Sequence, residues 1–273
     1  MRLFYIFISL IFFACVSSTK LENVRQVNSE LWSGSAPVSK VDFNHLKEIG
    51  IKSLISVDGA VPELEKAKAA GMVYRHVPYS YGKISEEDQA KLIKAFSELP
   101  KPVYIHCHHG RHRAPAGAAV VLKNLFSWKG EEAVAMMKIF GTSREYNGLY
   151  ETALTGKLIP ESKWQKAKTA EVSEVDVIVR EMAVIDRHWD ELKEISKDGW
   201  NDRKKAAQET LLIRESFFEL DRLNKNHYMT FEKSLASLKN LENSISNGSA
   251  ESLTKQLQMI RNQCKSCHKK FRD

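Results

Sequence analysis

A cysteine and an arginine six residues apart form the first group that could do chemistry. The segment 103–115 contains the pattern His-Cys-x-x-Gly-x-x-Arg, which includes Cys107 and Arg113. An apolar run precedes Cys107 and a helical pattern follows Arg113, so we expect the cysteine between a strand and a helix N-terminus. The positive potential there lowers the pKa of a thiol and produces a nucleophilic thiolate. Arg113 supplies a planar fork for two phosphate oxygens.

The residues between this cysteine and arginine suit an anion-binding loop. Backbone N–H groups can curl around a bound anion, and a glycine permits the tight turn. The residues expected to bind phosphate are His108, His109, Gly110, Arg111 and His112. Thiolate attack on phosphorus gives a cysteinyl-phosphate, which water then hydrolyses. A metal site among the histidines is the alternative; we favour His106 as a residue that orients Cys107, with the others adding positive charge or binding substrate.

A second group lies near the C-terminus, where Cys264, Cys267 and His268 form a Cys-x-x-Cys-His motif. Two thiols one helical turn apart can add to the two vinyl groups of one haem, and the adjacent histidine can then bind the iron. A zinc site needs a second ligand pair, and no other cysteine lies in this part of the sequence. A thioredoxin-like pair would follow a strand rather than a helix. We therefore expect one covalently attached haem c.

The N-terminus has the features of an export signal. Met1-Arg2 precedes a run at 3–14 that is apolar except for Ser9, and this run is too short to span a bilayer comfortably. We expect a signal peptide at 1–18. Ala14-Cys15 resembles a bacterial lipoprotein cleavage site, so two alternatives stay open: membrane anchoring through a lipidated Cys15, or ordinary secretion. Both predict an exported protein, periplasmic or lipid-anchored in a bacterial envelope, where c-type haem is attached.

Composition limits the remaining possibilities. The chain has 273 residues, 43% apolar and 27% charged, which predicts a soluble protein of one or two domains. Its net charge of +7 favours anionic ligands such as phosphate, but is too small to argue for nucleic acid. The 4 cysteines are too few for a disulfide framework.

Short apolar runs alternate with helical patterns in the first half of the chain. The expected strands are 51–57, 73–77 and 103–106. The expected helices are 41–49, 63–70, 86–99, 115–125, 131–140 and 147–154. This alternation predicts an α/β domain with a mostly parallel sheet. Asp58 directly follows the expected strand at 51–57, so it should point toward the same sheet edge as Cys107.

The second half has a different pattern. We expect a polar linker at 156–171 and a second domain at 172–273, where apolar residues recur at three- and four-residue steps. Breaks near Gly199, Asn224–Asn226 and Asn247-Gly248 divide this region into four amphipathic helices. About 100 residues in four such helices predict an all-α four-helix bundle.

Residues 24–155 resemble the dual-specificity and tyrosine phosphatases, on the loop motif and on the segments 31–37 and 51–57. The resemblance implies phosphomonoester hydrolysis, with a substrate that the sequence does not identify. Two departures stand out. Ala114 occupies the position where the family has Ser or Thr, and Ser80 stands where some relatives carry the general acid. Asp58 is an alternative candidate for that acid. Rhodanese-like sulfurtransferases have a shorter loop, so the phosphatase interpretation is preferred.

The last helix, with the haem motif, resembles that of cytochrome c′, and the likeness covers 172–273. It implies haem c bound through Cys264 and Cys267, with His268 as the iron ligand. In some relatives the sixth position is empty, and in others a methionine of the first helix fills it. Met182 is the candidate here; ordinary core packing is the alternative.

Together these features predict an exported, haem-containing phosphatase, regulated through redox state or a gas ligand of the haem. The partners implied are a phosphorylated substrate and a small gas or redox partner. The rival hypothesis is a protein without turnover, either an anion-binding sensor or an electron-transfer cytochrome.

Overall fold

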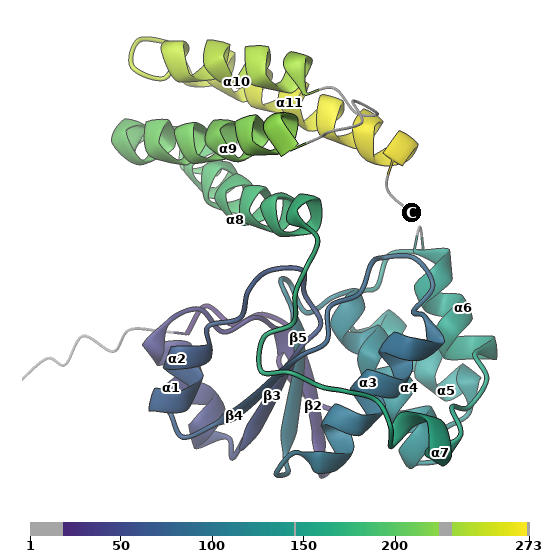
Figure 1. Ribbon diagram of the computed structural model, residues 1–273. Helices are drawn as coiled ribbons and strands as arrows, with labels where there is room; N and C mark the ends of the chain where they lie inside the picture. Colours follow the sequence, from purple (N-terminus) through teal and green to yellow (C-terminus); the bar gives the residue numbers. More distant parts are fainter. Residues whose placement is uncertain (1–18, 145, 224–230, 272–273) are drawn as a thin grey trace, which may run out of the picture.

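The computed structural model of the protein describes residues 19–144, 146–223 and 231–271. The predicted signal peptide, Cys15 and the predicted break at Asn224–Asn226 lie outside these residues. An α/β unit is connected to a separate group of helices above it (Figure 1). Within the described ranges, no helix combines the length and the apolar character needed to cross a membrane.

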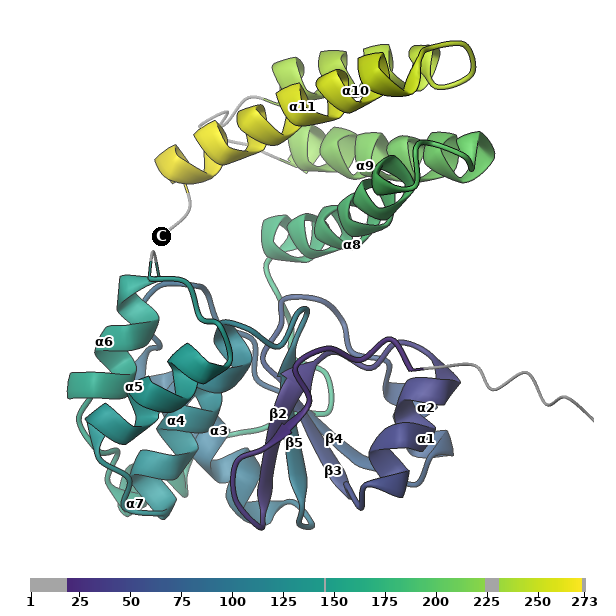
Figure 2. The same ribbon diagram turned by 180° about the vertical axis from the view of Figure 1, so that it is seen from behind.

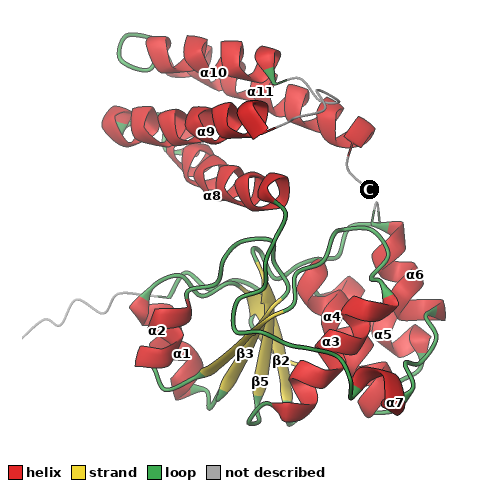
Figure 3. Cartoon of the chain, in the orientation of Figure 1, coloured by secondary structure: helices red, strands yellow, loops and turns green. Residues whose placement is uncertain are grey.

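A five-stranded sheet forms the centre of the α/β unit (Figure 3). Its strands are β1 (Arg25–Gln26), β2 (Leu31–Ser35), β3 (Ser53–Ser56), β4 (Val73–His76) and β5 (Val103–Cys107), in the order β1-β2-β5-β3-β4. β1 pairs antiparallel with β2, and the other pairs are parallel. The predicted mostly parallel sheet is therefore confirmed. The sequence does not predict β2, because Gly and Ser, which favour turns, make up three of its five residues.

Helices cover both faces of this sheet (Figures 1 and 2). One face carries α1 (Lys40–Glu48) and α2 (Leu64–Ala69); the other carries α3 (Glu86–Glu98), α4 (Arg113–Leu125), α5 (Gly130–Ile139), α6 (Asn147–Thr155) and α7 (Glu161–Trp164). Because successive strand residues point to opposite faces, Tyr104 of β5 packs in one hydrophobic cluster and Ile105 in the other. Cys107 falls on the same side as Ile105. The helices begin and end close to the predicted positions.

The segment predicted as a linker, 156–171, instead packs on the α/β unit. It contains α7, and Ile159 is buried in the same cluster as residues of α4. The backbone N–H of His76 donates a hydrogen bond to the carbonyl of Ala170, 3.0 Å away. The segment is polar on average, but Ile159 and Trp164 give it enough apolar surface to attach. The α/β unit thus extends past the predicted boundary at residue 155.

Four helices follow: α8 (Val177–Lys197), α9 (Arg203–Leu223), α10 (Glu232–Ser244) and α11 (Ala250–Phe271). Two predicted breaks are confirmed: Gly199 has a φ of +70°, and α10 and α11 are separated around Gly248. Residues of all four helices share one hydrophobic cluster, with Leu192, Ile213, Leu238 and Ile260 fully buried. The relationship of these helices to cytochrome c′ stays a prediction.

α8 lies against the edge of the sheet where β3 and β5 end. Gly59, just after β3, is so close to α8 that a Cβ atom there would come within 2.5 Å of Val179 Cγ1. The loop after β5 contacts α8 through His108, whose Nδ1 lies 3.1 Å from a carboxylate oxygen of Asp186. The helical unit therefore touches the edge where parallel α/β sheets place their functional residues.

Candidate active site

The loop after β5 connects the two residues that the sequence singles out. Cys107 is the last residue of β5 and Arg113 is the first residue of α4. Their exposed fractions are 3% and 6%. The predicted strand–loop–helix arrangement is confirmed, and it places the thiol before the N-terminus of a helix, where unpaired N–H groups favour a bound anion.

Gly110 is required by the shape of this loop. Its φ is +65°, which disfavours other residues, and a Cβ atom there would lie 2.2 Å from the carbonyl carbon of Gly34 in β2. The loop is held from outside at three further points: the N–H of Ala36 donates to the carbonyl of His108, Thr142 Oγ1 donates to that of Arg111 and the hydroxyl of Tyr79 donates to that of Arg113. With these carbonyls engaged outward, the loop can direct amide groups inward.

Two side chains contact the guanidinium of Arg113. Its Nη2 lies 3.2 Å from Asp58 Oδ1 and donates a hydrogen bond to the hydroxyl of Tyr81, also at 3.2 Å. The guanidinium carbon lies 4.4 Å from the centre of the Tyr81 ring. The Nε atom is buried and has no hydrogen-bond partner among the described residues. A buried donor without a partner is costly, so a hydrogen-bond acceptor at Nε would stabilise this arrangement.

Asp58 is a charged partner of this loop rather than an acid. Burial acts to raise its pKa, but the charge of Arg113 and hydrogen bonds from the N–H groups of Ala60 and His108 outweigh burial and hold the pKa well below its usual range. The N–H of His108 lies 2.6 Å from Asp58 Oδ2. A general acid must carry a proton before it can donate one. In this arrangement Asp58 therefore does not fit the role of general acid that the sequence suggests.

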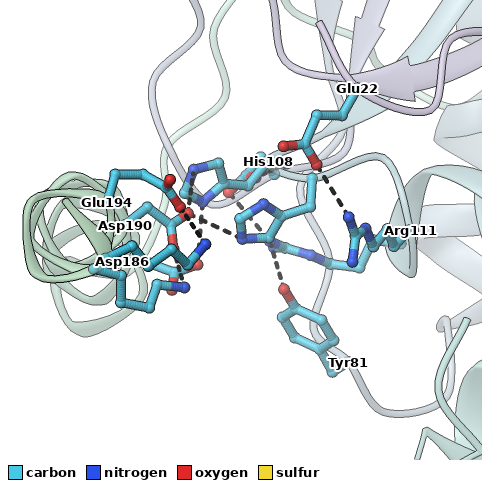
Figure 4. A network of polar contacts seen from close by, with 12 residues as sticks. Glu22, Tyr81, His108, Arg111, Asp186, Asp190 and Glu194 are labelled. Atoms are coloured by element: carbon cyan, nitrogen blue, oxygen red, sulfur yellow. Dashed lines mark hydrogen bonds and ion pairs between the residues drawn. The ribbon is translucent and has the colours of Figure 1, made fainter. Parts of the chain in front are cut away.

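The side chains of the loop after β5 do not make the phosphate-binding arrangement that the sequence predicts. His108 and His109 turn toward α8, where they contact Asp186 and Asp190 (Figure 4). Arg111 pairs with Glu22 at 3.2 Å. His112 Nδ1 accepts the N–H of Ser143. Of the residues expected to bind phosphate, these four thus have their side chains engaged elsewhere. What His109, Arg111 and His112 can offer an anion is backbone N–H, whereas the N–H of His108 is donated to Asp58.

His106 is buried beneath the loop. Its Nε2 is hydrogen-bonded to the hydroxyl of Tyr74, and its ring stacks on Tyr104. Burial lowers the pKa of His106 to about 3, so the ring is neutral. Its Nδ1 has no hydrogen-bond partner among the described residues. The side chain therefore supports the end of β5 from the opposite face to Cys107.

Sequence reasoning misses three residues of this site. Tyr81 lies in the segment where the resemblance would place an acid, and no pattern marks an isolated tyrosine there. Asp186 and Asp190 belong to α8, and their four-residue spacing puts them on one helix face. That face looks like an ordinary solvated surface until the fold brings it to the loop.

Comparisons with known proteins concern the α/β unit. No family model matches the sequence, and no curated protein matches it. Among solved structures, TpbA from P. aeruginosa aligns at 16% identity over 53% of this chain and 89% of its own, with a TM-score of 0.45. The catalytic core of the PP-IP phosphatase Siw14 from S. cerevisiae aligns at 22% identity over 50% of this chain and 87% of its own, with a TM-score of 0.43. The matched part is the N-terminal half.

The haem motif lies near the end of α11. Cys264 and Cys267 are half-buried free thiols that pack against the hydrophobic cluster of the helical unit, and Met182 of α8 packs against the same cluster. Burial raises the pKa of the Cys264 thiol to about 11. Two thiols one helical turn apart beside a histidine, with a methionine packed against the same cluster, form a donor set that fits a c-type haem.

Proposed function

We propose that this protein is a cysteine-dependent phosphatase that hydrolyses phosphomonoesters through a cysteinyl-phosphate. The proposal rests on the geometry of one loop. Cys107 and Arg113 lie at its two ends, and Gly110 permits its tight turn. Within the described residues, the buried Nε of Arg113 has no hydrogen-bond partner. Thiol, guanidinium and helix N-terminus together suit a tetrahedral dianion.

The reaction has two steps. The phosphate group binds to loop N–H groups and Arg113, and the Cys107 sulfur attacks phosphorus while the bond to the leaving oxygen breaks. The leaving oxygen departs with the bonding electron pair and takes a proton from water, and the phosphoryl group remains on sulfur. Water then attacks phosphorus, the thiolate leaves, and inorganic phosphate is released. The donors of the loop stabilise the charge that spreads over the phosphoryl oxygens in both steps.

Asp58 and Tyr81 act on this chemistry through Arg113. The ion pair with Asp58 and the contact with the Tyr81 ring fix the guanidinium at the start of α4. The carboxylate also accepts the N–H of His108, an amide that would otherwise be available to substrate. We therefore assign both side chains as positioning residues.

The direct test is an assay of the purified protein on an aryl phosphate, with vanadate as inhibitor. We expect turnover that vanadate blocks, and loss of turnover in Cys107→Ser with retention of vanadate binding. Lys255→Gln is the control, because Lys255 is an exposed lysine of α11 that pairs with Glu251 and takes no part in either proposed site. Unchanged turnover in Cys107→Ser would contradict the nucleophile assignment.

A second candidate function is anion sensing without turnover. Two observations favour it: Asp58 is ionised and paired with Arg113, and Ala114 has no hydroxyl to assist departure of the thiolate. This candidate predicts that wild-type protein binds vanadate and phosphate but hydrolyses no aryl phosphate. The assay above distinguishes the two.

The second half of the proposal is a single haem c attached through Cys264 and Cys267, with His268 as axial ligand and Met182 as a candidate sixth ligand. Bound haem supplies a redox centre and, where its sixth position is open, a site for small gases. The predicted export signal supports this proposal, since such a signal would direct the chain to the compartment where c-type haem is attached. We extend the proposal to a periplasmic or lipid-anchored location, with Cys15 as the residue to be lipidated.

Haem regulation of the phosphatase has a physical route in α8. Asp186 contacts His108 of the loop at 3.1 Å, and α8, which carries Asp186, shares one hydrophobic cluster with α11. Met182 lies one helical turn before Asp186 on α8. Turnover should therefore differ between ferric, ferrous and nitric-oxide-bound protein, and Asp186→Asn should reduce that difference. Equal rates in all three states would remove the regulatory proposal.

A further inference from the structure

The loop after β5 and α8 together hold a cluster of metal-ligand side chains. Among the residues that the structure describes, His108, His109 and Asp190 form a group of histidine and acidic side chains whose ligand atoms all lie within 4.8 Å of one another. All three are partly buried where the loop meets α8 (Figure 4). Two elements far apart in the sequence thus contribute to one cluster.

The distances match those around a tetrahedral cation. Asp190 Oδ2 lies 3.4 Å from Nε2 of His108 and 3.2 Å from Nε2 of His109. Zinc bonds to nitrogen and oxygen are roughly 2.1 Å long, which puts two ligands of a tetrahedron about 3.4 Å apart. A cation can therefore bind Asp190 Oδ2 and either nitrogen at these distances, and all three ligand atoms lie within 4.8 Å of one another.

The surrounding contacts orient these ligands. Asp186 Oδ2 lies 3.1 Å from Nδ1 of His108, so a proton on Nδ1 leaves Nε2 free to bind, as carboxylates do behind metal-bound histidines. Lys193 pairs with the other carboxylate oxygen of Asp190, which leaves Oδ2 for the cation. The rings of His108 and His109 are stacked, with centroids 4.2 Å apart and planes at 11°. Because an imidazole lone pair lies in the plane of its ring, one of the two rings must turn before both nitrogens can bind one ion.

We propose that His108, His109 and Asp190 bind a divalent cation of the zinc class and so join the loop after β5 to α8. Two imidazoles and a carboxylate suit such an ion. Three protein ligands leave a fourth position for water. The bound cation would fix the first two residues after Cys107 to the helical unit, a link that the phosphatase chemistry itself does not use.

Equilibrium dialysis of the full-length, haem-loaded protein against Zn²⁺ tests this site without an activity measurement. We expect Asp190→Asn to lose one zinc per chain or to bind it at least tenfold more weakly, and His109→Gln to do the same. Asp186→Asn, which removes only the orienting carboxylate, should weaken binding by about 10- to 100-fold. Glu194→Gln is the matched control: Glu194 is an exposed carboxylate of the same helix, paired with Lys197.

Thiol sites elsewhere in the chain contribute equally to all of these variants, so only the differences between variants count. Thermal unfolding without zinc checks that Asp190→Asn is folded. The proposal is overturned if the wild-type protein binds no zinc, or if Asp190→Asn and His109→Gln match Glu194→Gln in number and affinity of zinc.

Discussion

The carboxylate of Asp58 lies 3.2 Å from the guanidinium of Arg113, and both side chains are more than nine-tenths buried. This pair decides the state of the loop before substrate arrives. It keeps the guanidinium in place at the start of α4, and it keeps Asp58 ionised. A phosphate dianion that binds to Arg113 must therefore lie close to the carboxylate of Asp58, which binds the same guanidinium.

The substitution Asp58→Asn should destabilise the folded protein without removing a proton donor. Breaking a buried ion pair leaves an uncompensated charge, so Asp58→Asn should lower the free energy of unfolding by on the order of 3 kcal/mol. Activity per folded molecule should fall by less than the roughly 10²-fold or more that a general acid is worth. Denaturant unfolding and kcat/KM measure the two effects. If Asp58→Asn loses activity and its pH profile no longer falls at high pH, Asp58 would be the general acid after all.

The same pair predicts a pH dependence. The folded pKa of Asp58 is depressed from its ordinary value of 3.8, so the contribution of the carboxylate to stability is complete above that value and is lost as pH falls toward the folded pKa. The difference in unfolding free energy between wild type and Asp58→Asn should be constant from about pH 5 to pH 8 and shrink below about pH 4. A difference that changes near neutral pH would contradict the assignment.

The rate of hydrolysis should depend strongly on the leaving group of the substrate. The carboxyl group beside Arg113 is that of Asp58, which is ionised and has no proton to donate. An alkoxide leaves poorly without a proton. Aryl phosphates should therefore be hydrolysed faster than alkyl phosphates by about 10²- to 10⁴-fold, the usual value of general acid catalysis. Parallel kcat/KM measurements on both substrates give the ratio. Comparable rates would show that another residue donates the proton, and Tyr81→Phe would then be the first variant to test.

Gly110 and Gly71 form a matched pair of glycines. Both have positive φ, +65° and +80°, but a Cβ atom at Gly71 meets nothing within 4 Å, whereas one at Gly110 meets the backbone of β2. Gly71→Ala should cost about 1 kcal/mol of stability. Gly110→Ala should cost more and abolish most phosphatase activity, because the loop must move. Equal effects in unfolding and in turnover would show that the loop tolerates a side chain.

The haem proposal predicts a covalent link. Haem should stay with the chain after denaturation and acidic organic extraction, and Cys264→Ser together with Cys267→Ser should release it. If Met182 binds the iron, the reduced spectrum should be low-spin and should change in Met182→Ala. Haem-stained denaturing gels and absorption spectra check these results, with Met259→Ala as a control, because Met259 is an exposed methionine of α11. Extractable haem in the matured, exported protein would contradict the thioether link.

Local signals in the sequence are strong enough to predict most of the α/β elements. Ser85 accepts the N–H of Asp88 at the start of α3, and Gly50 and Gly71 follow α1 and α2 with positive φ, as their residue types indicate. The strand–loop–helix around Cys107 is equally local. Each of these features depends on residues within a few positions of one another.

The contacts of the site that are distant in sequence could not be predicted. His108 and Asp186 are 78 residues apart, and nothing in either segment specifies where α8 lies. The pairing of Asp58 with Arg113 depends on how β3 and β5 are placed side by side in the sheet. The packing of 156–171 depends on Ile159 and Trp164 in a stretch whose average composition is polar. Such contacts follow from the assembled fold rather than from local pattern.

The central claim is that Cys107 carries the phosphoryl group during turnover. Acid quenching of the protein during hydrolysis of an aryl phosphate, followed by mass analysis of its peptides, tests this directly. We predict a phosphoryl adduct on the peptide containing Cys107 in the wild-type protein and no adduct in Cys107→Ser, which should also lack turnover. Continued hydrolysis by Cys107→Ser, or an adduct on another residue, would contradict the account.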